Sequence, residues 1–245
     1  MMNLLAHTLK VYTKNLGMVL FFSIPLIIAL LLPLFSVAPT YSALGGYFLR
    51  SGSMPQMTTM DLLVIGVASI FSLLLLSLAM VAINLVVKSM KARTRISSEV
   101  IKSLGKYTLV VFSLFLAMKV VETGILIFVI SNDITELPVF VFSFIASLGL
   151  FFATPAVVLE EKKPVPSLIA SYKHIMRKPL HLVAWLVLAF IMVAAVMQIS
   201  YTLLDMFAVS RFITQLIVVL INSLVVLPLL IIFSAEIYLT KYTIL

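Results

Sequence analysis

The chain of 245 residues contains no cysteine and has few charged residues. The lack of cysteine excludes a disulfide framework, a thiolate nucleophile and a cysteine-based metal site. Charged residues make up 11% of the chain, whereas a soluble globular domain has about 25%. No segment is long and polar enough to form a separate soluble domain. We therefore interpret residues 1–245 as a single integral membrane domain.

Recognisable catalytic and metal-binding patterns are also lacking. The histidines, His7, His174 and His181, have no cysteine or carboxylate partners at metal-ligand spacing, so we expect no metal site. No glycine-rich phosphate loop, nucleophile elbow or HExxH motif occurs. The carboxylate pair 160–161 lies at the end of an apolar stretch beside two lysines, where we expect it to be solvated. The sequence thus predicts no catalytic set and no cofactor, and we expect a protein that is not an enzyme.

Long apolar stretches dominate what is present. The chain is 63% hydrophobic, with a mean hydropathy of +1.24. A helix needs about 20 apolar residues to cross the hydrocarbon core, and six stretches are that long: 16–38, 62–87, 107–130, 138–159, 180–203 and 212–240. Period-2 alternation is absent, which leaves helices as the spanning element. We predict an all-α, polytopic membrane protein with six transmembrane helices. The first stretch exceeds the usual signal-peptide core of about 7–15 residues, so we expect it to be retained.

The basic residues alternate between connections. Lys and Arg gather before residue 16, in 88–106, in 160–178 and after 240, whereas 39–61, 131–137 and 204–211 hold few. Lys and Arg in short loops face the cytoplasm. This distribution predicts a multi-pass protein of the cell membrane with both termini in the cytoplasm. It also accounts for the net charge of +8 without a nucleic-acid partner.

Three basic amphipathic segments precede pairs of apolar stretches: Leu4–Lys14, Thr94–Lys106 and Val165–Arg177. Their apolar residues recur at helical spacing, which predicts three helices in the headgroup plane of the cytoplasmic face. Anionic lipid would add about 1 kcal/mol for each nearby base. The candidate surface for lipid headgroups, or for a membrane or cytoplasmic protein partner, consists of Lys91, Arg93, Arg95, Lys102, Lys173 and Arg177.

The three amphipathic segments can be aligned with one another. Leu5 corresponds to Val100 and Leu168, positions separated by 95 residues and then by 68. A hydroxyl occupies the same aligned position each time: Thr8, Ser103 and Ser171. The alignment favours three repeats of an interfacial helix and a helical hairpin, with units 1–87, 88–159 and 160–245. The alternative is that any basic helix next to a membrane span shows this spacing.

The end of the fourth stretch and the segment after it carry a family resemblance. Residues 154–160 read Thr-Pro-Ala-Val-Val-Leu-Glu, and residues 166–171 read Pro-Ser-Leu-Ile-Ala-Ser. This pattern resembles that of uncharacterised six-span proteins related to the membrane domain of glycerophosphodiester phosphodiesterases. It covers the architecture and about 20 residues. The resemblance implies no activity for the membrane part, and the soluble phosphodiesterase barrel is absent from this chain.

Lys119 and Glu122 lie near the middle of the third stretch. A charge at the centre of a span costs about 2.5–3.5 kcal/mol on insertion scales, and residues three apart share a helix face. The two residues are either a structural ion pair or the lining of a polar pathway. A separate motif also bears on transport. Residues Glu99 to Gly105 have the Glu-to-Gly spacing of the coupling loop of importer-type ABC permeases, but they lack its alanines and its closing Leu-Pro.

Two functional hypotheses remain. The first is a non-enzymatic membrane protein that acts as a scaffold, a complex subunit or a lipid-organising factor. The alternative is a transporter or permease subunit with a polar site around Lys119 and Glu122.

Overall fold

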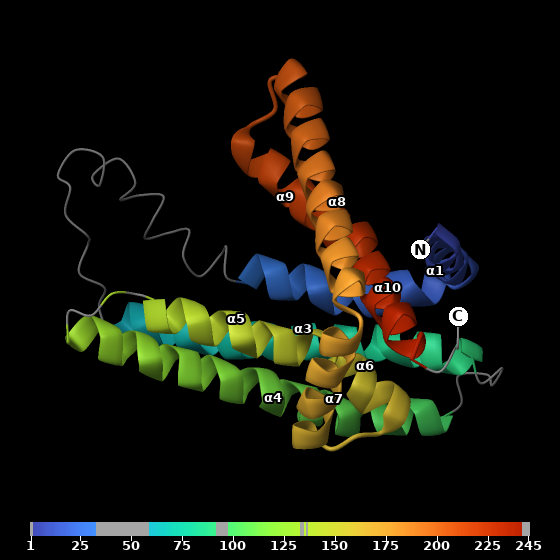
Figure 1. Cartoon of the computed structure of the whole chain (residues 1–245). Helices are drawn as coiled ribbons and strands as arrows, with labels where there is room; N and C mark the ends of the chain where they lie inside the picture. The colour runs from blue at the N-terminus through green and yellow to red at the C-terminus, as the bar shows by residue number, and fades with distance from the viewer. Residues whose placement is uncertain (1, 33–58, 92–97, 133–134, 136, 242–245) are drawn as a thin grey trace.

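A computed structural model describes residues 2–32, 59–91, 98–132, 135 and 137–241. All elements in these ranges are helices (Figure 1), which confirms the predicted all-α class. After α1 (Met2–Lys14) and an unlabelled helix at Leu16–Leu32, the elements are α3 (Thr59–Lys91), α4 (Ser98–Ser131), α5 (Leu137–Phe151), α6 (Ala153–Glu160), α7 (Pro164–Arg177), α8 (Pro179–Met206), α9 (Arg211–Ile221), the π-helical segment η1 (Asn222–Val226) and α10 (Leu227–Leu239).

Five helical stretches are long and apolar enough to cross a membrane: Leu63–Met90, Ser103–Val129, Leu137–Glu160, Pro179–Met206 and Arg211–Leu239. A sixth would be the bent pair Leu4–Lys14 and Leu16–Leu32, whose axes differ by 89°. The described chain therefore has five to six helices of membrane-spanning length, in agreement with a membrane protein.

The second amphipathic segment differs from the prediction. We expected a separate interfacial helix over 94–106. Residues 98–106 instead form the first turns of α4, which continues unbroken to Ser131. The weakest helix former at the junction is Gly105, and a single glycine costs about 1 kcal/mol in a helix, too little to end one that is otherwise apolar. Residues 94–97 lie outside the described residues.

The second helix of each predicted unit lies in the core of the molecule. The fully buried stretches are 81–87 of α3, 152–158 at the start of α6 and 229–238 of α10, and these three helices contact one another. The first helices lie outside them. In α8 the most apolar window has none of its residues buried, and in the α4 span the share is 11%.

The amphipathic segments join the units in a cycle. Leu104 and Tyr107 of α4 pack against Val81 and Leu85 of α3, in the preceding unit. Helix α7 packs on α5 and α6, again in the preceding unit, and α1 packs on α10. Each unit thus places its first segment on the second span of the unit before it, and α1 on α10 closes the cycle. The repeat of an interfacial helix and a helical hairpin stays a prediction.

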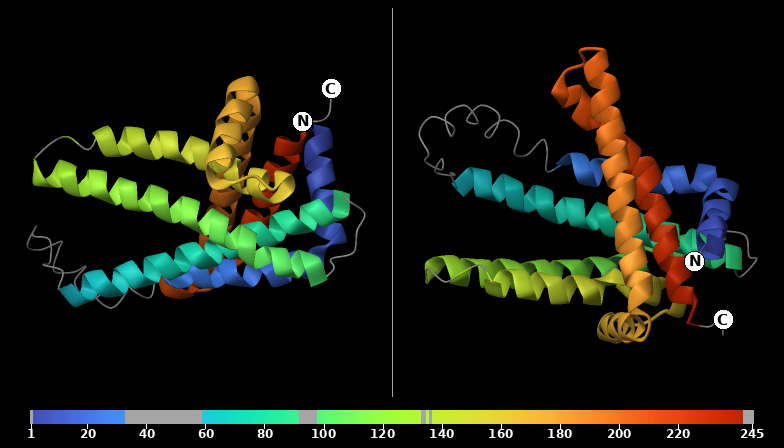
Figure 2. Two further views of the ribbon diagram at one scale, coloured as in Figure 1. Left: turned by 90° about the horizontal axis from the view of Figure 1, so that it is seen from below. Right: turned by 45° about the horizontal axis from the view of Figure 1, so that its top comes forward.

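The three hairpins have different directions. Helices α3, α4 and α5 lie lengthwise beside one another, whereas α8 and the helices after it rise steeply from this layer (Figure 1). Two further views show the same crossing and place α1 and the end of α10 at the same end of the molecule (Figure 2). The basic ends of the hairpins therefore meet, and the apolar ends diverge.

Candidate functional site

The intramembrane charges lie on the wall of a groove between three helices. Lys119 Nζ lies 2.8 Å from Glu122 Oε2 on α4, and the Ser143 hydroxyl of α5 donates to Glu122 Oε1 at 2.5 Å. The structure thus brings the two predicted residues together and adds Ser143, which the sequence alone did not single out. The ion pair lies within α4, and the hydrogen bond from Ser143 to Glu122 links α4 to α5.

The groove beside this pair has a volume of about 380 Å³ and is walled mainly by apolar side chains of α3, α4 and α5. Leu73 and Leu76 come from α3, Phe115 from α4, and Phe142 and Leu150 from α5. The Lys119 side chain is 59% exposed and that of Glu122 is 28% exposed. The pair therefore faces an accessible space, which a binding or pathway role also requires.

Helix α7 buries two serines against the protein and exposes three apolar residues on its outer side. Ser167 and Ser171 are fully buried, whereas Val165, Ile169 and Met176 are 64%, 50% and 76% exposed. We predicted one apolar face that includes Leu168 and Ile175 as well, but those two residues pack into the protein. We call α7 an inverted helix because serines face the protein and apolar residues are exposed on its outer side. This outer side matches an apolar environment.

The buried side of α7 binds free backbone groups at the bend between α5 and α6. At Phe152 the chain leaves α5 with φ −104° and ψ 7° and re-enters a helix as α6. The Ser171 hydroxyl accepts a hydrogen bond from the Phe152 N–H at 3.0 Å and donates to the Leu148 carbonyl at 2.9 Å. These are the two groups that a continuous α-helix would join. The hydroxyl therefore satisfies both at the bend.

A similar contact occurs where α1 meets the last span. Pro228 has no N–H to give to the Leu224 carbonyl four residues earlier, and the Tyr12 hydroxyl of α1 donates to that carbonyl at 3.0 Å. Amphipathic helices α1 and α7 thus each supply a hydroxyl to an interrupted span. The hydroxyls predicted as a repeat feature are only partly the ones used, because Thr8 bonds within its own helix, to Leu4.

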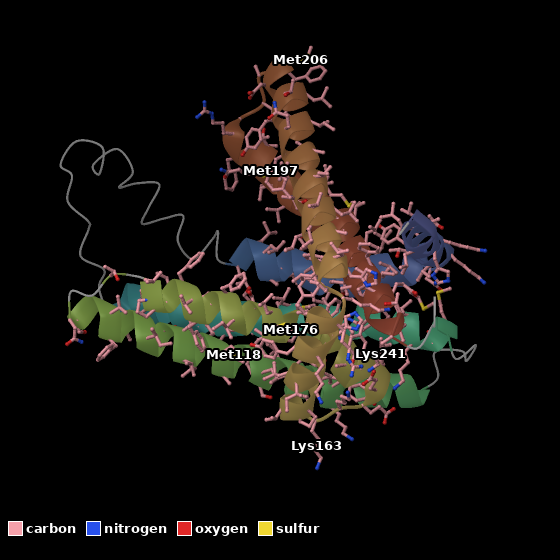
Figure 3. All side chains as sticks on the ribbon, viewed as in Figure 1. Met118, Lys163, Met176, Met197, Met206 and Lys241 are labelled. Carbon is pink, nitrogen blue, oxygen red and sulfur yellow. The ribbon has the colours of Figure 1, made fainter. Side chains whose placement is uncertain are left out.

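Charged side chains gather where the basic ends meet. Lys88 of α3 binds Glu161 at 2.8 Å and the Val158 carbonyl at 3.0 Å. These contacts, chiefly the hydrogen bond and the positive charge of Lys88, hold the pKa of Glu161 below its ordinary value. Glu160 pairs with Lys162 and with Lys241, just after α10. Lys163 and Lys241 lie at this end of the molecule, whereas Met197 and Met206 follow α8 away from it (Figure 3). The pair 160–161, which we expected to be solvated, also links the end of α6 to α3 and to the end of α10.

His174 lies inside this junction. It is 5% exposed, and its ring stands edge-on to Phe152 at 4.8 Å between centroids, with Tyr238 at 5.5 Å. Burial, reinforced by the positive charge of Lys178, lowers the pKa of His174 to about 4. The ring is therefore neutral at physiological pH.

His174 makes stability depend on pH in a defined window. The folded protein keeps the ring neutral down to its pKa of about 4, while the unfolded chain takes up a proton near 6.5. Stability is therefore full above pH 6.5 and falls as the pH is lowered toward 4, by at most about 3 kcal/mol. Melting of the detergent-solubilised protein across this range measures the slope. His174→Phe should flatten it, and an unchanged slope in this variant would exclude His174 as the cause.

The predicted lipid or partner surface is placed only in part. Lys173 and Arg177 are exposed on the outer side of α7. Lys91 ends α3 and Lys102 lies in the first turns of α4, but their side chains, and Arg93 and Arg95 altogether, lie outside the described residues.

No family model, curated protein or solved structure matches the chain. The resemblance of residues 154–171 to the phosphodiesterase-related membrane proteins therefore stays a prediction. Within the described residues, the features that argue for a function are the groove at Lys119 and Glu122 and the outer side of α7.

Proposed function

We propose that this chain is a non-enzymatic integral protein of the cell membrane that organises anionic lipid, or holds a membrane or cytoplasmic protein partner, at the cytoplasmic face. The observation that carries the proposal is the inverted helix α7. Its outer side combines Val165, Ile169 and Met176 with the exposed bases Lys173 and Arg177. An apolar stripe bordered by bases suits a helix lying between acyl chains and anionic headgroups.

The proposal places α1 and α7 at one membrane surface. In α1, Thr8, Val11 and Tyr12 are buried against the protein, while Lys10 and Lys14 are exposed. Both helices dock on the core through hydroxyl-bearing faces, so they form rigid parts of the molecule and not loose appendages. A rigid basic platform is what a scaffold or a lipid-organising factor requires.

Arg177 provides the test of lipid organisation. Trp185 is the single tryptophan, lies two turns into α8 after α7, and is half-buried with its Nε1 donating to the Leu230 carbonyl at 3.0 Å. In vesicles, a brominated anionic lipid should quench the fluorescence of Trp185 more strongly than a brominated zwitterionic lipid. Arg177→Glu should lower this preference about fivefold for each unit of charge, because one base contributes about 1 kcal/mol.

Arg211→Glu is the matched control. Arg211 is also exposed, but it begins α9 at the far end of the third hairpin. The control should keep the lipid preference of the wild type. If Arg177→Glu and Arg211→Glu behave alike, or if the wild type shows no preference, anionic lipid is not organised by α7.

We further propose six spans with both termini in the cytoplasm. The basic ends that meet at Glu160 and Glu161 would then lie inside, and the ends near Asn132 and Phe207 outside. Because transmembrane helices tilt by up to about 40°, the steep third hairpin (Figure 2) would turn about its base on insertion. This topology assigns every basic connection to the same side.

A single-cysteine series tests the topology, because the chain has no cysteine of its own. Cysteines at 132 and 207 should react with a membrane-impermeant maleimide from outside intact cells, and cysteines at 163 and 173 only after permeabilisation. Labelling at 207 only from the cytoplasmic side would contradict the third hairpin as a pair of spans.

The groove favours a second candidate, a transporter or permease subunit. Its supporting observation is the accessible ion pair of Lys119 and Glu122 at membrane depth. Cysteines at 119 and 122 extend the same labelling series. A polar pathway requires that they react with a water-soluble maleimide, and complete protection of both would argue against transport.

A further inference from the structure

We propose that the groove between α3, α4 and α5 binds a single-chain lipid whose head is uncharged and carries oxygen acceptors, such as a monoacylglycerol. The inference goes beyond the lipid-organising function of α7, because it concerns another surface and another lipid class. It names a ligand for the groove of the second candidate, but binding does not require that the ligand cross the membrane.

The groove has a charged end at Lys119 and Glu122, and apart from Ser147 the lining beyond Ser143 on α5 is apolar. Glu122 and Ser143 face each other at that end. Seven residues along α5 from Ser143, a distance of about 10 Å at 1.5 Å per residue, the lining consists of Leu150, with Phe115 of α4. The buried Ala146 lies on the lining between them. A polar end followed by an apolar channel has the polarity of an amphiphile with one chain.

The charge at the polar end selects an uncharged head. Lys119 and Glu122 neutralise each other, and both oxygens of Glu122 already accept hydrogen bonds. An ionised carboxylate or phosphate would add a net charge at membrane depth, where an unpaired charge is costly. A cationic head would do the same. A neutral head avoids this penalty.

Lys119 supplies the donors that such a head needs. An ammonium has three N–H donors, and among the described residues Glu122 is the acceptor that Lys119 Nζ binds, at 2.8 Å. The side chain is 59% exposed, so a ligand oxygen can approach. A hydrogen bond to a charged group contributes about 1.5–3 kcal/mol, which favours a hydroxyl or ester oxygen over a plain hydrocarbon.

The size of the groove favours one chain. Ligand pockets usually measure about 300–1,000 Å³, and about 380 Å³ is near the lower limit. A phospholipid with two acyl chains would leave one chain outside. A monoacylglycerol combines one chain, no charge, an ester carbonyl and two hydroxyls.

Photolabelling of the full chain in lipid nanodiscs tests the proposal. The probe is a monoacylglycerol with a diazirine in its acyl chain, and the labelled residues are mapped by mass spectrometry. We expect saturable labelling on α4 and α5 around Phe115 and Leu150. Unlabelled monoacylglycerol should compete, while the ionised fatty acid and the alkane of equal length should compete at least tenfold more weakly.

Two variants and one control identify the site. Ser147→Leu fills the groove from an exposed position that tolerates change, and it should abolish the labelling. Lys119→Leu/Glu122→Leu removes the donors without leaving a lone charge and should weaken competition by monoacylglycerol about tenfold. Ile24→Phe fills a second, wholly apolar groove of about 320 Å³ beside Phe21 and Leu104, and it should change nothing.

Several outcomes would overturn the proposal: equal competition by the alkane, labelling spread along the exposed surface of α8, or wild-type labelling in a Ser147→Leu protein with unchanged melting. If instead the fatty acid competes best, the head is anionic and the charge argument is wrong. Protection of cysteines at 119 and 122 from water with labelling retained would reject transport and keep the binding site.

Discussion

Gly149→Ala should destabilise the protein by about 1–3 kcal/mol, although alanine is a better helix former than glycine. A Cβ atom at position 149 would lie 2.9 Å from the ring of Tyr172, and overpacking of this kind carries such a cost. The Tyr172 hydroxyl also donates to the Ile145 carbonyl at 2.5 Å, so the ring cannot withdraw without losing that bond. Unfolding in mixed detergent micelles measures the effect.

The Tyr172→Ala background should reverse the sign. With the ring removed, the three atoms nearest to the added Cβ are gone, and Gly149→Ala gains the helix preference of alanine, about 1 kcal/mol. Gly124→Ala in α4 is a matched control, because nothing lies within 4 Å of its added Cβ, and it should stabilise by a similar amount. If Gly149→Ala destabilises equally in both backgrounds, the contact between α5 and α7 is not the cause.

Replacing either member of the intramembrane ion pair should cost more than replacing both. Lys119→Leu leaves Glu122 with the Ser143 hydroxyl alone, and Glu122→Leu leaves Lys119 without its carboxylate. Each single variant should lose about 2–3 kcal/mol, the cost of an uncompensated charge in a span. The double variant should lie within about 1 kcal/mol of the wild type, because an apolar pair of similar volume replaces a neutral ion pair. Unfolding free energies of the three variants in the same micelles form the double-mutant cycle.

An uncharged pair supplies the control for this cycle. Gln198 donates to the Thr202 hydroxyl at 3.3 Å on the exposed surface of α8. Replacing one or both of these residues by leucine and valine should give small, nearly additive effects. Additive losses at Lys119 and Glu122 as well would mean that the two charges do not compensate each other.

The helical class and the charged pair could be predicted from the sequence because both depend on local properties. Apolar stretches of spanning length leave the backbone few choices, and Lys119 and Glu122 are close simply because they share a helix face. Of the two bends, the one in the last span is marked in the sequence by Pro228, which lacks an N–H, whereas the break at Phe152 has no such mark. The residues that satisfy the freed groups, Ser171 and Tyr12, lie far away in sequence and could not be paired without the fold.

Which side of α7 faces the protein could not be predicted either. Helical spacing gave Val165, Leu168, Ile169, Tyr172, Ile175 and Met176 as one apolar face. A face this wide can be divided between protein and lipid, and spacing does not say where. Ser171 favours the observed orientation, because its hydroxyl binds both free backbone groups at the bend in the neighbouring span. The separate helix expected over 94–106 failed for a related reason, since a basic amphipathic stretch can extend a span as readily as it can lie beneath one.

The contact between α1 and α10 has a consequence for synthesis in the cell. The side chains of Val11 and Tyr12 join the same core cluster as Leu229, Ile232 and Ala235, so α1 packs on a helix that is synthesised about 200 residues after it. The Leu224 carbonyl, which Pro228 cannot bind, receives the Tyr12 hydroxyl in the folded protein. During translation the buried face of α1 therefore lacks its packing partner until α10 has been inserted. Ribosome-bound intermediates that stop short of α10 would expose this surface to chaperones and proteases, which makes the closing contact a natural checkpoint for assembly.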